Sequence, residues 1–176
     1  MIQKVIDVKN PVLRQIAKPV LKLDKKVLSL IKDMKETLKT QKDPEGVGLA
    51  APQIGKSLRI FVVNYKKLKR IIINPEIIEI SPKKKLNGES KKKDILEGCL
   101  SLPHYYGPIK RSGKIKIKYI DENAKDQVEE FTGFNAQIIQ HEIDHLNGIL
   151  FIDKILEQKA PIYKFDGDEW EEVELI

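Results

Sequence analysis

The regular patterning of the chain begins with a stretch whose apolar residues repeat every three or four positions. Val27, Ile31, Met34 and Leu38 follow this spacing with lysines between them, which predicts an amphipathic helix near the N-terminus. Asp24 precedes them, and its carboxylate is a good acceptor for the unpaired N–H groups of a first helical turn. Proline and glycine then end the periodicity, and the small residues of GVGLAAPQIG predict a tight loop.

The middle of the chain carries the patterns of β-strands. Residues 58–65 and 70–80 are rich in isoleucine and valine, and Ile115, Ile117 and Tyr119 alternate with lysines. These segments predict strands of an antiparallel sheet. Between them, a lysine-rich segment of turn-forming residues, 82–94 in our division of the chain, favours a surface loop.

A second helix is predicted over residues 133–148, where Phe134, Ile138, His141 and His145 share one face. The glycine that closes this range stands where a helix C-terminal residue often adopts a left-handed conformation. The apolar letters ILFID that follow predict a short buried strand. Near the C-terminus, the apolar residues Trp170, Val173 and Leu175 favour one more strand packed on the domain.

The order of these elements favours an α+β fold, because a strand-rich middle is flanked by helices rather than alternating with them. We expect antiparallel or mixed sheets packed around a central helix that carries the letters HEIDH, with the N-terminal amphipathic helix beside them. A chain of 176 residues, 41% of them hydrophobic, suits a single domain over residues 1–176. Residues 157–176 form an acidic C-terminal extension of that domain.

Composition and charge indicate the cellular compartment and the partners to expect. The formal net charge is +6, but both signs are plentiful, so solvated surface is the first interpretation of the lysines and attraction to an anionic partner such as RNA is the second. The single cysteine excludes an internal disulfide and favours a reducing compartment. No signal-like segment and no run of eighteen apolar residues is present, so we expect a cytoplasmic protein without a membrane partner.

The strongest chemical motif is the HEIDH segment. His141 and His145 lie one helical turn apart and can point at a single metal ion, while Glu142 is offset by about 100 degrees and can reach a water molecule beside it. That arrangement suits hydrolysis. A catalytic metal site usually takes three protein ligands, and Cys99 in EGCLSLP is a candidate for the third, although a lone cysteine is more often an inert core residue.

Three segments together resemble the peptide deformylases: GVGLAAPQ at 46–53, EGCLS at 97–101 and HEIDH at 141–145. The likeness extends over roughly residues 5–156. It implies metal-dependent removal of the formyl group from the N-terminal formyl-methionine of nascent polypeptides, with release of formate. It also implies that Cys99, His141 and His145 hold one divalent metal ion, natively Fe(II), with Zn, Ni or Co able to occupy the same site.

The resemblance implies further roles. Glu142 would take a proton from the attacking water and give it to the departing amine, while the Gln53 amide and the Leu100 backbone N–H would stabilise the oxyanion. Residues expected to bind the substrate are Gly46, Val47, Gly48, Glu97, Phe134 and Ile138. Tyr106 stands where many family members carry an arginine, which puts the positioning of the peptide beyond methionine in question.

Three other residues receive non-catalytic roles. Asp144 and Arg111 resemble a pair that supports the ligand helix, and His104 is expected at the surface or at the rim of the cleft. For partners, we expect formyl-methionine N-termini, a transient association with the ribosome and no DNA, and we expect the protein to be a monomer.

Two other functions are consistent with parts of the sequence. The HExxH pattern alone would suit a metallopeptidase that cuts internal peptide bonds. The lysine clusters at 83–85 and 91–93 would suit a non-catalytic, metal-stapled domain that docks on ribosomal RNA. A structural metal site usually fills four protein ligands, however, and only three are apparent here, which favours catalysis.

Overall fold

The computed structural model describes residues 1–42, 44–82 and 96–174. In chain order, its elements are η1 (Pro11–Arg14), α1 (Lys25–Thr40), β1 (Gly48–Ala50), η2 (Ala51–Ile54), β2 (Ile60–Tyr65), β3 (Leu68–Ile80), β4 (Glu97–Cys99), β5 (Leu102–Gly107), β6 (Lys114–Ile120), β7 (Asp126–Thr132), α2 (Gly133–Leu146), α3 (Phe151–Gln158), β8 (Ile162–Phe165) and β9 (Trp170–Val173).

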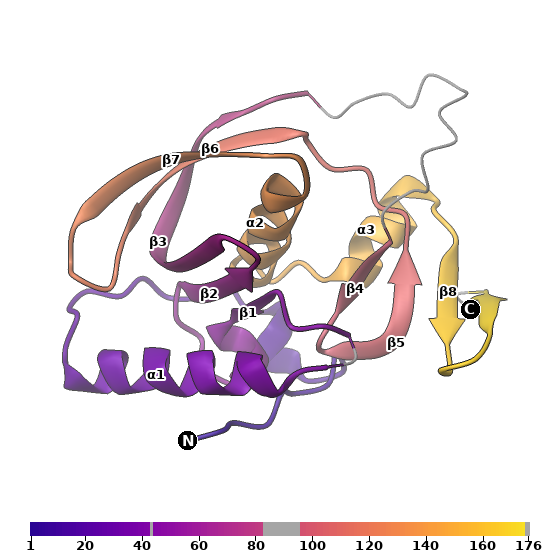
Figure 1. The fold of residues 1–176 in the computed structure, drawn as a ribbon, viewed down its shortest axis with the longest axis horizontal. Coiled ribbons are helices and arrows are strands. Elements are labelled where there is room, and N and C mark those ends of the chain that lie inside the picture. The colour runs from indigo at the N-terminus through magenta and orange to yellow at the C-terminus, as the bar shows by residue number, and fades with distance from the viewer. Residues whose placement is uncertain (43, 83–95, 175–176) are drawn as a thin grey trace.

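The strands form two sheets in which every neighbouring pair is antiparallel. The larger sheet has the order β1-β2-β3-β6-β7, and the smaller one has the order β4-β5-β8-β9. The predicted α+β class with antiparallel sheets is therefore confirmed. In Figure 1 the smaller sheet and the C-terminus lie at one end of the molecule, with α2 between the two sheets.

Helix α1 covers one side of the larger sheet. Asp24 accepts hydrogen bonds from the backbone N–H groups of Lys26 and Val27 at 2.9 and 3.0 Å, which satisfies two unpaired donors of the first turn. The apolar face predicted from the sequence is buried against β1 and β2, with Ile31, Met34 and Leu38 packing beside Leu49 and Val62. The lysines between these positions face solvent.

Helix α2 passes through the main core. Ile138, Ile139 and Ile143 pack against residues of β6 such as Ile115 and Ile117 on the facing side of the larger sheet. Burial on most sides leaves this helix little freedom to move, because a close-packed interior resists displacement. Gly148 follows α2 with φ of +71°, the left-handed conformation expected of it.

The predicted strand at ILFID is wrong, because this segment begins α3. The backbone N–H of Leu150 donates to Asp153 Oδ2 at 2.7 Å, which caps the new helix. Phe151 and Ile155 lie one helical turn apart and are both buried in the core of the smaller sheet. A short apolar run does not distinguish a buried strand from a buried helix by its periodicity, so packing decided the outcome.

Other segments depart from expectation in smaller ways. The segment predicted as a loop of small residues contains β1 and the single turn η2. Trp170 and Val173 lie in β9 as predicted, while Leu175 falls outside the described residues. The lysine-rich loop predicted over residues 82–94 also lies outside the described residues, apart from residue 82. None of the helices in the described part of the chain has the length and apolar character needed to cross a membrane.

Candidate metal centre and active site

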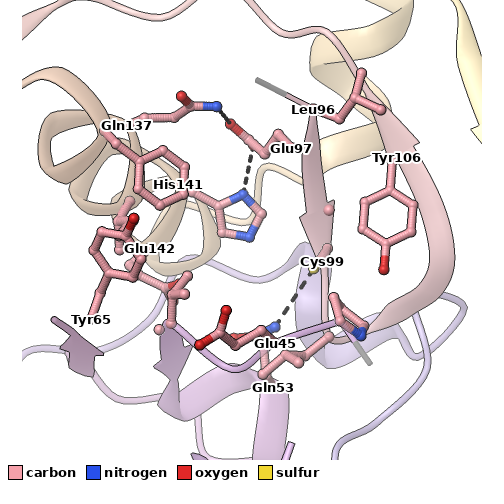
Figure 2. A pocket seen from close by; sticks show the side chains of 17 residues that line it. Glu45, Gln53, Tyr65, Leu96, Glu97, Cys99, Tyr106, Gln137, His141 and Glu142 are labelled. Atoms are coloured by element: carbon pink, nitrogen blue, oxygen red, sulfur yellow. Dashed lines mark hydrogen bonds and ion pairs between the residues drawn. The ribbon is translucent and has the colours of Figure 1, made fainter. Parts of the chain in front are cut away.

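The helix α2 and the end of strand β4 bring one sulfur and two imidazole nitrogens together. His141 Nε2 lies 3.2 Å from His145 Nε2, which in turn lies 3.3 Å from Cys99 Sγ. The three candidate ligand atoms are all within 4.8 Å of one another. The histidines share a face because they are four residues apart on α2, and Cys99 reaches them because β4 ends beside that face (Figure 2).

A buried chain of charges orients one of these histidines. His141 Nδ1 lies 2.7 Å from Glu97 Oε1, so its Nε2 is left to face Cys99 and His145. Arg111 donates to both oxygens of Glu97 at 2.6 and 2.7 Å and to Asp144 Oδ2 at 2.9 Å. Arg111 therefore ties β4 to α2.

The electrostatics of this chain keep the Glu97 carboxylate ionised. Burial alone would raise the pKa of Glu97, but the hydrogen bonds from Arg111 and the charge of His141 outweigh it and hold that pKa well below its usual range. Burial likewise opposes a charge on His141, yet Glu97 raises the pKa of that imidazole. The carboxylate of Glu97 is thus a permanent acceptor that fixes the ring.

The donor set fits a divalent metal ion. Burial would raise the pKa of Cys99, but the adjacent imidazoles lower it to about 5, so the thiolate form that ligates metals is favoured. One thiolate and two imidazoles suit Zn and Fe(II) alike. Three donors among the described residues, rather than four, are the arrangement of catalytic sites, in which one position stays open.

Glu142 projects into the same cavity without joining the donor set. Its side chain is buried, Oε2 has no hydrogen-bond partner among the described residues, and burial raises its pKa to about 7. Gly48 makes room for it, since a Cβ at that position would stand 2.3 Å from Glu142 Oε1. A carboxylate held this way is available for proton transfer.

Gln53 is held in one orientation by contacts at both ends of its amide. Its Oε1 accepts the backbone N–H of Ala50 at 2.9 Å, and its Nε2 lies 3.3 Å from Ser101 Oγ and 3.6 Å from Cys99 Sγ. The side chain is 1% exposed. The donor end of the amide therefore points toward the metal-binding cluster, as Figure 2 shows.

A cavity of about 290 Å³ lies in front of the cluster. Most of the residues predicted from the sequence line it together: Val47, Gly48, Gln53, Glu97, Cys99, Leu100, Phe134, Ile138, His141 and Glu142. Gly46 does not line it. A Cβ there would meet the Leu38 carbonyl oxygen at 2.7 Å, so this glycine serves the close approach of its loop to α1.

The sequence did not single out several residues of this cavity. Glu45, Tyr65 and Gln137 all line it, and Gln137 Nε2 donates to Glu97 Oε2 at 3.2 Å. Gln137 lies four residues before His141 on α2, so helical periodicity could have found it. Tyr65, at the end of β2, has no local signal of this kind. Tyr106 also lines the cavity, whereas His104 is exposed outside it.

The donor set, the free carboxylate and the cavity can be compared with known proteins. A family model described as polypeptide deformylase matches residues 2–161. The chain belongs to the polypeptide deformylase family. The match to the family ends before β8 begins, so β8 and β9 lie beyond it.

Relatives and solved structures agree with this membership in the family. The chain is 43% identical to the peptide deformylase of Pseudothermotoga lettingae over 155 residues, covering 88% of this chain and 84% of that protein. A crystal structure of peptide deformylase from Thermotoga maritima matches with a TM-score of 0.78 and 41% identity, covering 88% of this chain and 97% of the other. A Met-Ala-Ser bound structure of class I type b peptide deformylase from Acinetobacter baumannii matches with a TM-score of 0.77 and 32% identity, covering 88% and 99%.

Proposed function

We propose that this protein hydrolyses the N-formyl group of polypeptides that begin with formyl-methionine and releases formate. The observation that carries the proposal is the meeting of Cys99, His141 and His145 in front of a cavity that also holds the Glu142 carboxylate. The relatives named peptide deformylase support the same activity. The tripeptide in the Acinetobacter baumannii structure supports a peptide as the ligand of such a cavity.

Cys99, His141 and His145 would hold one divalent metal ion. Such an ion polarises a carbonyl group and makes water a better nucleophile at neutral pH. We propose Fe(II) as the native ion, with Zn, Ni or Co able to occupy the same donors, because thiolate and imidazole accept several borderline metals.

Glu142 carries the proton transfers. Its Oε2 is buried in the cavity and has no partner among the described residues, so it can accept a proton from the attacking water. The same carboxylic acid then protonates the nitrogen of the breaking amide, which is otherwise a poor leaving group. Gly48 allows this, since any side chain in its place would displace the carboxylate.

The developing oxyanion needs fixed hydrogen-bond donors. The Gln53 amide is held at its oxygen by the Ala50 N–H, which aims its Nε2 toward the cluster. The backbone N–H of Leu100 is the second donor that we propose, at the turn directly after Cys99. Losing one such donor typically costs about 3 kcal/mol of transition-state stabilisation.

An apolar pocket would accept the methionine side chain. Phe134 and Ile138 stand on the face of α2 that carries His141, and Val47 lines the same cavity. Tyr65 braces Phe134 edge to face, with ring centroids 4.9 Å apart. An unbranched apolar chain can pack against these side chains without burying an unpaired polar group.

Glu97 and the glycines fill supporting parts of this substrate site. Both oxygens of Glu97 are engaged by Arg111 and one by His141, so we assign this carboxylate to the orientation of His141 rather than to direct contact with the peptide. Gly48 stays a candidate for close backbone approach to the substrate, and Gly46 shapes the loop that presents it.

The proposed setting is the cytoplasm, where nascent chains emerge and where a cysteine ligand stays reduced. We propose a monomer that meets the ribosome only transiently. The lysine clusters that would attract RNA lie at 83–85 and 91–93, outside the described residues, and the C-terminal extension is acidic instead.

Release of formate from formyl-Met-Ala-Ser tests the proposal. The Fe(II)-loaded protein is assayed without oxygen, because oxidation of Cys99 or of the ion would silence it. We expect formate and intact Met-Ala-Ser by mass spectrometry, with acetyl-Met-Ala-Ser unchanged. Cleavage within the peptide would instead establish a metallopeptidase, and bound metal with no turnover of any peptide would establish a structural metal domain.

A further inference from the structure

The smaller sheet has one face that its core does not cover. Side chains of neighbouring strands that pair directly lie on the same face, and residues along each strand alternate between faces. Ile162 and Val173 pair with each other and pack into the core with α3. Tyr163 and Phe165 stand one and three positions after Ile162 along β8. Trp170 stands three positions before Val173 along β9. An odd separation reverses the face, so all three side chains lie on the outer face.

Aromatic side chains form a connected row on this outer face. Trp170 stacks on Phe165 with ring centroids 4.7 Å apart and an interplanar angle of 29°. It also meets Tyr106 of β5 edge to face at 5.3 Å. Trp170 nevertheless remains 51% exposed, so the connected rings form an apolar patch that is open to solvent.

The aromatic row is continuous with the cavity of the proposed active site. Tyr106 belongs to both, since it lines the cavity and contacts Trp170. Its ring lies across Gly98 of β4, where a Cβ would come within 2.7 Å of two ring carbons. In Figure 2, Tyr106 stands on the Cys99 side of the cavity, opposite His141 and Tyr65. A peptide leaving the cavity past Tyr106 would meet the row.

The segment that carries Phe165 and Trp170 of the row is rich in acidic residues. Among residues 162–174, Lys164 is the single basic residue, against six acids: Asp166, Asp168, Glu169, Glu171, Glu172 and Glu174. Glu172 pairs with Tyr163 across the strands and so shares the outer face with the rings. Glu45 adds a carboxylate at the cavity itself. Exposed aromatic faces framed by carboxylates attract cationic side chains.

We propose that the outer face of β5, β8 and β9, from Tyr106 to Trp170, is an extension of the substrate cleft that binds lysine and arginine side chains downstream of formyl-methionine. The inference rests on the proposed function, because the occupant is the rest of the same peptide. Two strand spacings separate β5 from β9, about 10 Å, which an extended peptide crosses in about three residues. Cationic residues at about the fourth to sixth positions of the peptide would reach the row.

The fluorescence of Trp170 reads this binding directly, since Trp170 is the only tryptophan of the chain. The metal-loaded protein is titrated with the deformylated peptides Met-Ala-Ser-Lys-Arg-Lys and Met-Ala-Ser-Gln-Ser-Gln at about 20 mM and about 300 mM salt. We expect a saturable change in emission with the basic peptide that weakens at high salt. An unchanged emission on saturation, or an equal response to both peptides, would overturn the proposal.

Kinetics on the formylated forms of the same peptides give the second test. We expect kcat/KM for the basic peptide to exceed that for the neutral one by about fivefold at low salt. Trp170→Leu keeps apolar bulk without the indole ring and should bring the ratio close to one, while Trp170→Phe restores part of it. Glu172→Gln should lower the ratio about twofold, and the matched control Glu76→Gln, an exposed glutamate on β3, should leave it unchanged.

The outcomes separate this proposal from the function on which it rests. The protein could release formate from formyl-Met-Ala-Ser and yet show equal kcat/KM for the basic and the neutral six-residue peptides. That result would refute the extension of the cleft but not the deformylase activity. No formate from any formylated peptide would refute the activity itself. If the Trp170→Leu variant still preferred the basic peptide, the selectivity would come from another part of the protein, and the proposal would be wrong. Sedimentation of a dimer that Trp170→Leu dissociates, together with a ratio of one, would assign the face to self-association instead.

Discussion

The α2 side of the cavity is buried in the main core, whereas the facing side consists of short strands of the smaller sheet, whose outer face is partly exposed in the described part of the chain. His141, Glu142 and Ile138 of α2 are all buried. On the other side, Cys99 is equally buried, but Tyr106 is half-buried and Trp170 behind it is exposed. The groups that we propose to react therefore lie on the rigid side or at its contact with β4, and the more accessible surface begins at Tyr106.

This difference has a physical reason. Catalytic groups must be held to within a fraction of an ångström, which a close-packed helix achieves. A surface that receives many different peptide sequences needs exposure and adaptable contacts instead. The two sides are joined by Arg111, which binds Glu97 of β4 and Asp144 of α2. Changes on the two sides should consequently affect different measurements.

Glu142→Ala should have the largest effect, because it removes the proposed proton carrier from the rigid side. We expect kcat/KM for formyl-Met-Ala-Ser to fall by a factor of about 10² to 10⁴. Metal content, measured by elemental analysis, and the midpoint of urea unfolding should stay close to those of the unchanged protein. Glu142→Gln, which keeps the shape, should be equally inactive. Activity within tenfold of the original would show that another group moves the proton.

Arg111→Met should break the connection between the two sides. It leaves Glu97 as a buried carboxylate without its main partner, and Arg111 is itself only 7% exposed. Removing one partner of such a pair costs about 3 to 5 kcal/mol of unfolding free energy, which urea denaturation measures. Adding Glu97→Gln should recover part of the loss. A fall of less than about 1 kcal/mol would mean that packing alone joins the sides.

Gly48→Ala should disturb the rigid side without removing a functional group. The new methyl would stand 2.3 Å from Glu142 Oε1, so the carboxylate must move. Misplacing a reacting group by about 1 Å can cost about 10²-fold, and we expect kcat to fall by that order while KM changes little. Steady-state kinetics measure this. An unchanged kcat would indicate that Glu142 has freedom that its burial does not suggest.

Gly98→Ala is the matching change on the exposed side and should have the smallest effect. The new methyl would press on the ring of Tyr106, at 2.7 Å, but that ring ends a partly exposed side chain and can swing aside. We expect KM for formyl-Met-Ala-Ser to rise about threefold with kcat unchanged. A loss in kcat comparable with that of Gly48→Ala would contradict the assignment of different tasks to the two sides.

Local pattern alone was enough to predict the elements whose periodicity is long or sharply alternating. The strands over residues 60–65 and 114–120 lie where alternation and β-branched runs placed them. The strand prediction at ILFID failed because a run of four apolar residues carries no distinguishable period, and the helix found there depends on the Asp153 cap and on burial against the smaller sheet. The roles of individual site residues stay predictions that the experiments above address.

The sequence by itself determined which chemistry is available: two histidines one helical turn apart, a carboxylate between them and a single cysteine in a distant segment. It determined these because helical spacing and ligand type are local properties. Only the tertiary structure decided that Glu97 orients His141, that Arg111 links β4 to α2, and that Trp170 contacts Tyr106 of the cavity. These contacts join residues that are 14 to 64 positions apart in the chain. They arise when separate helices and strands pack together, so no local sequence pattern predicts them.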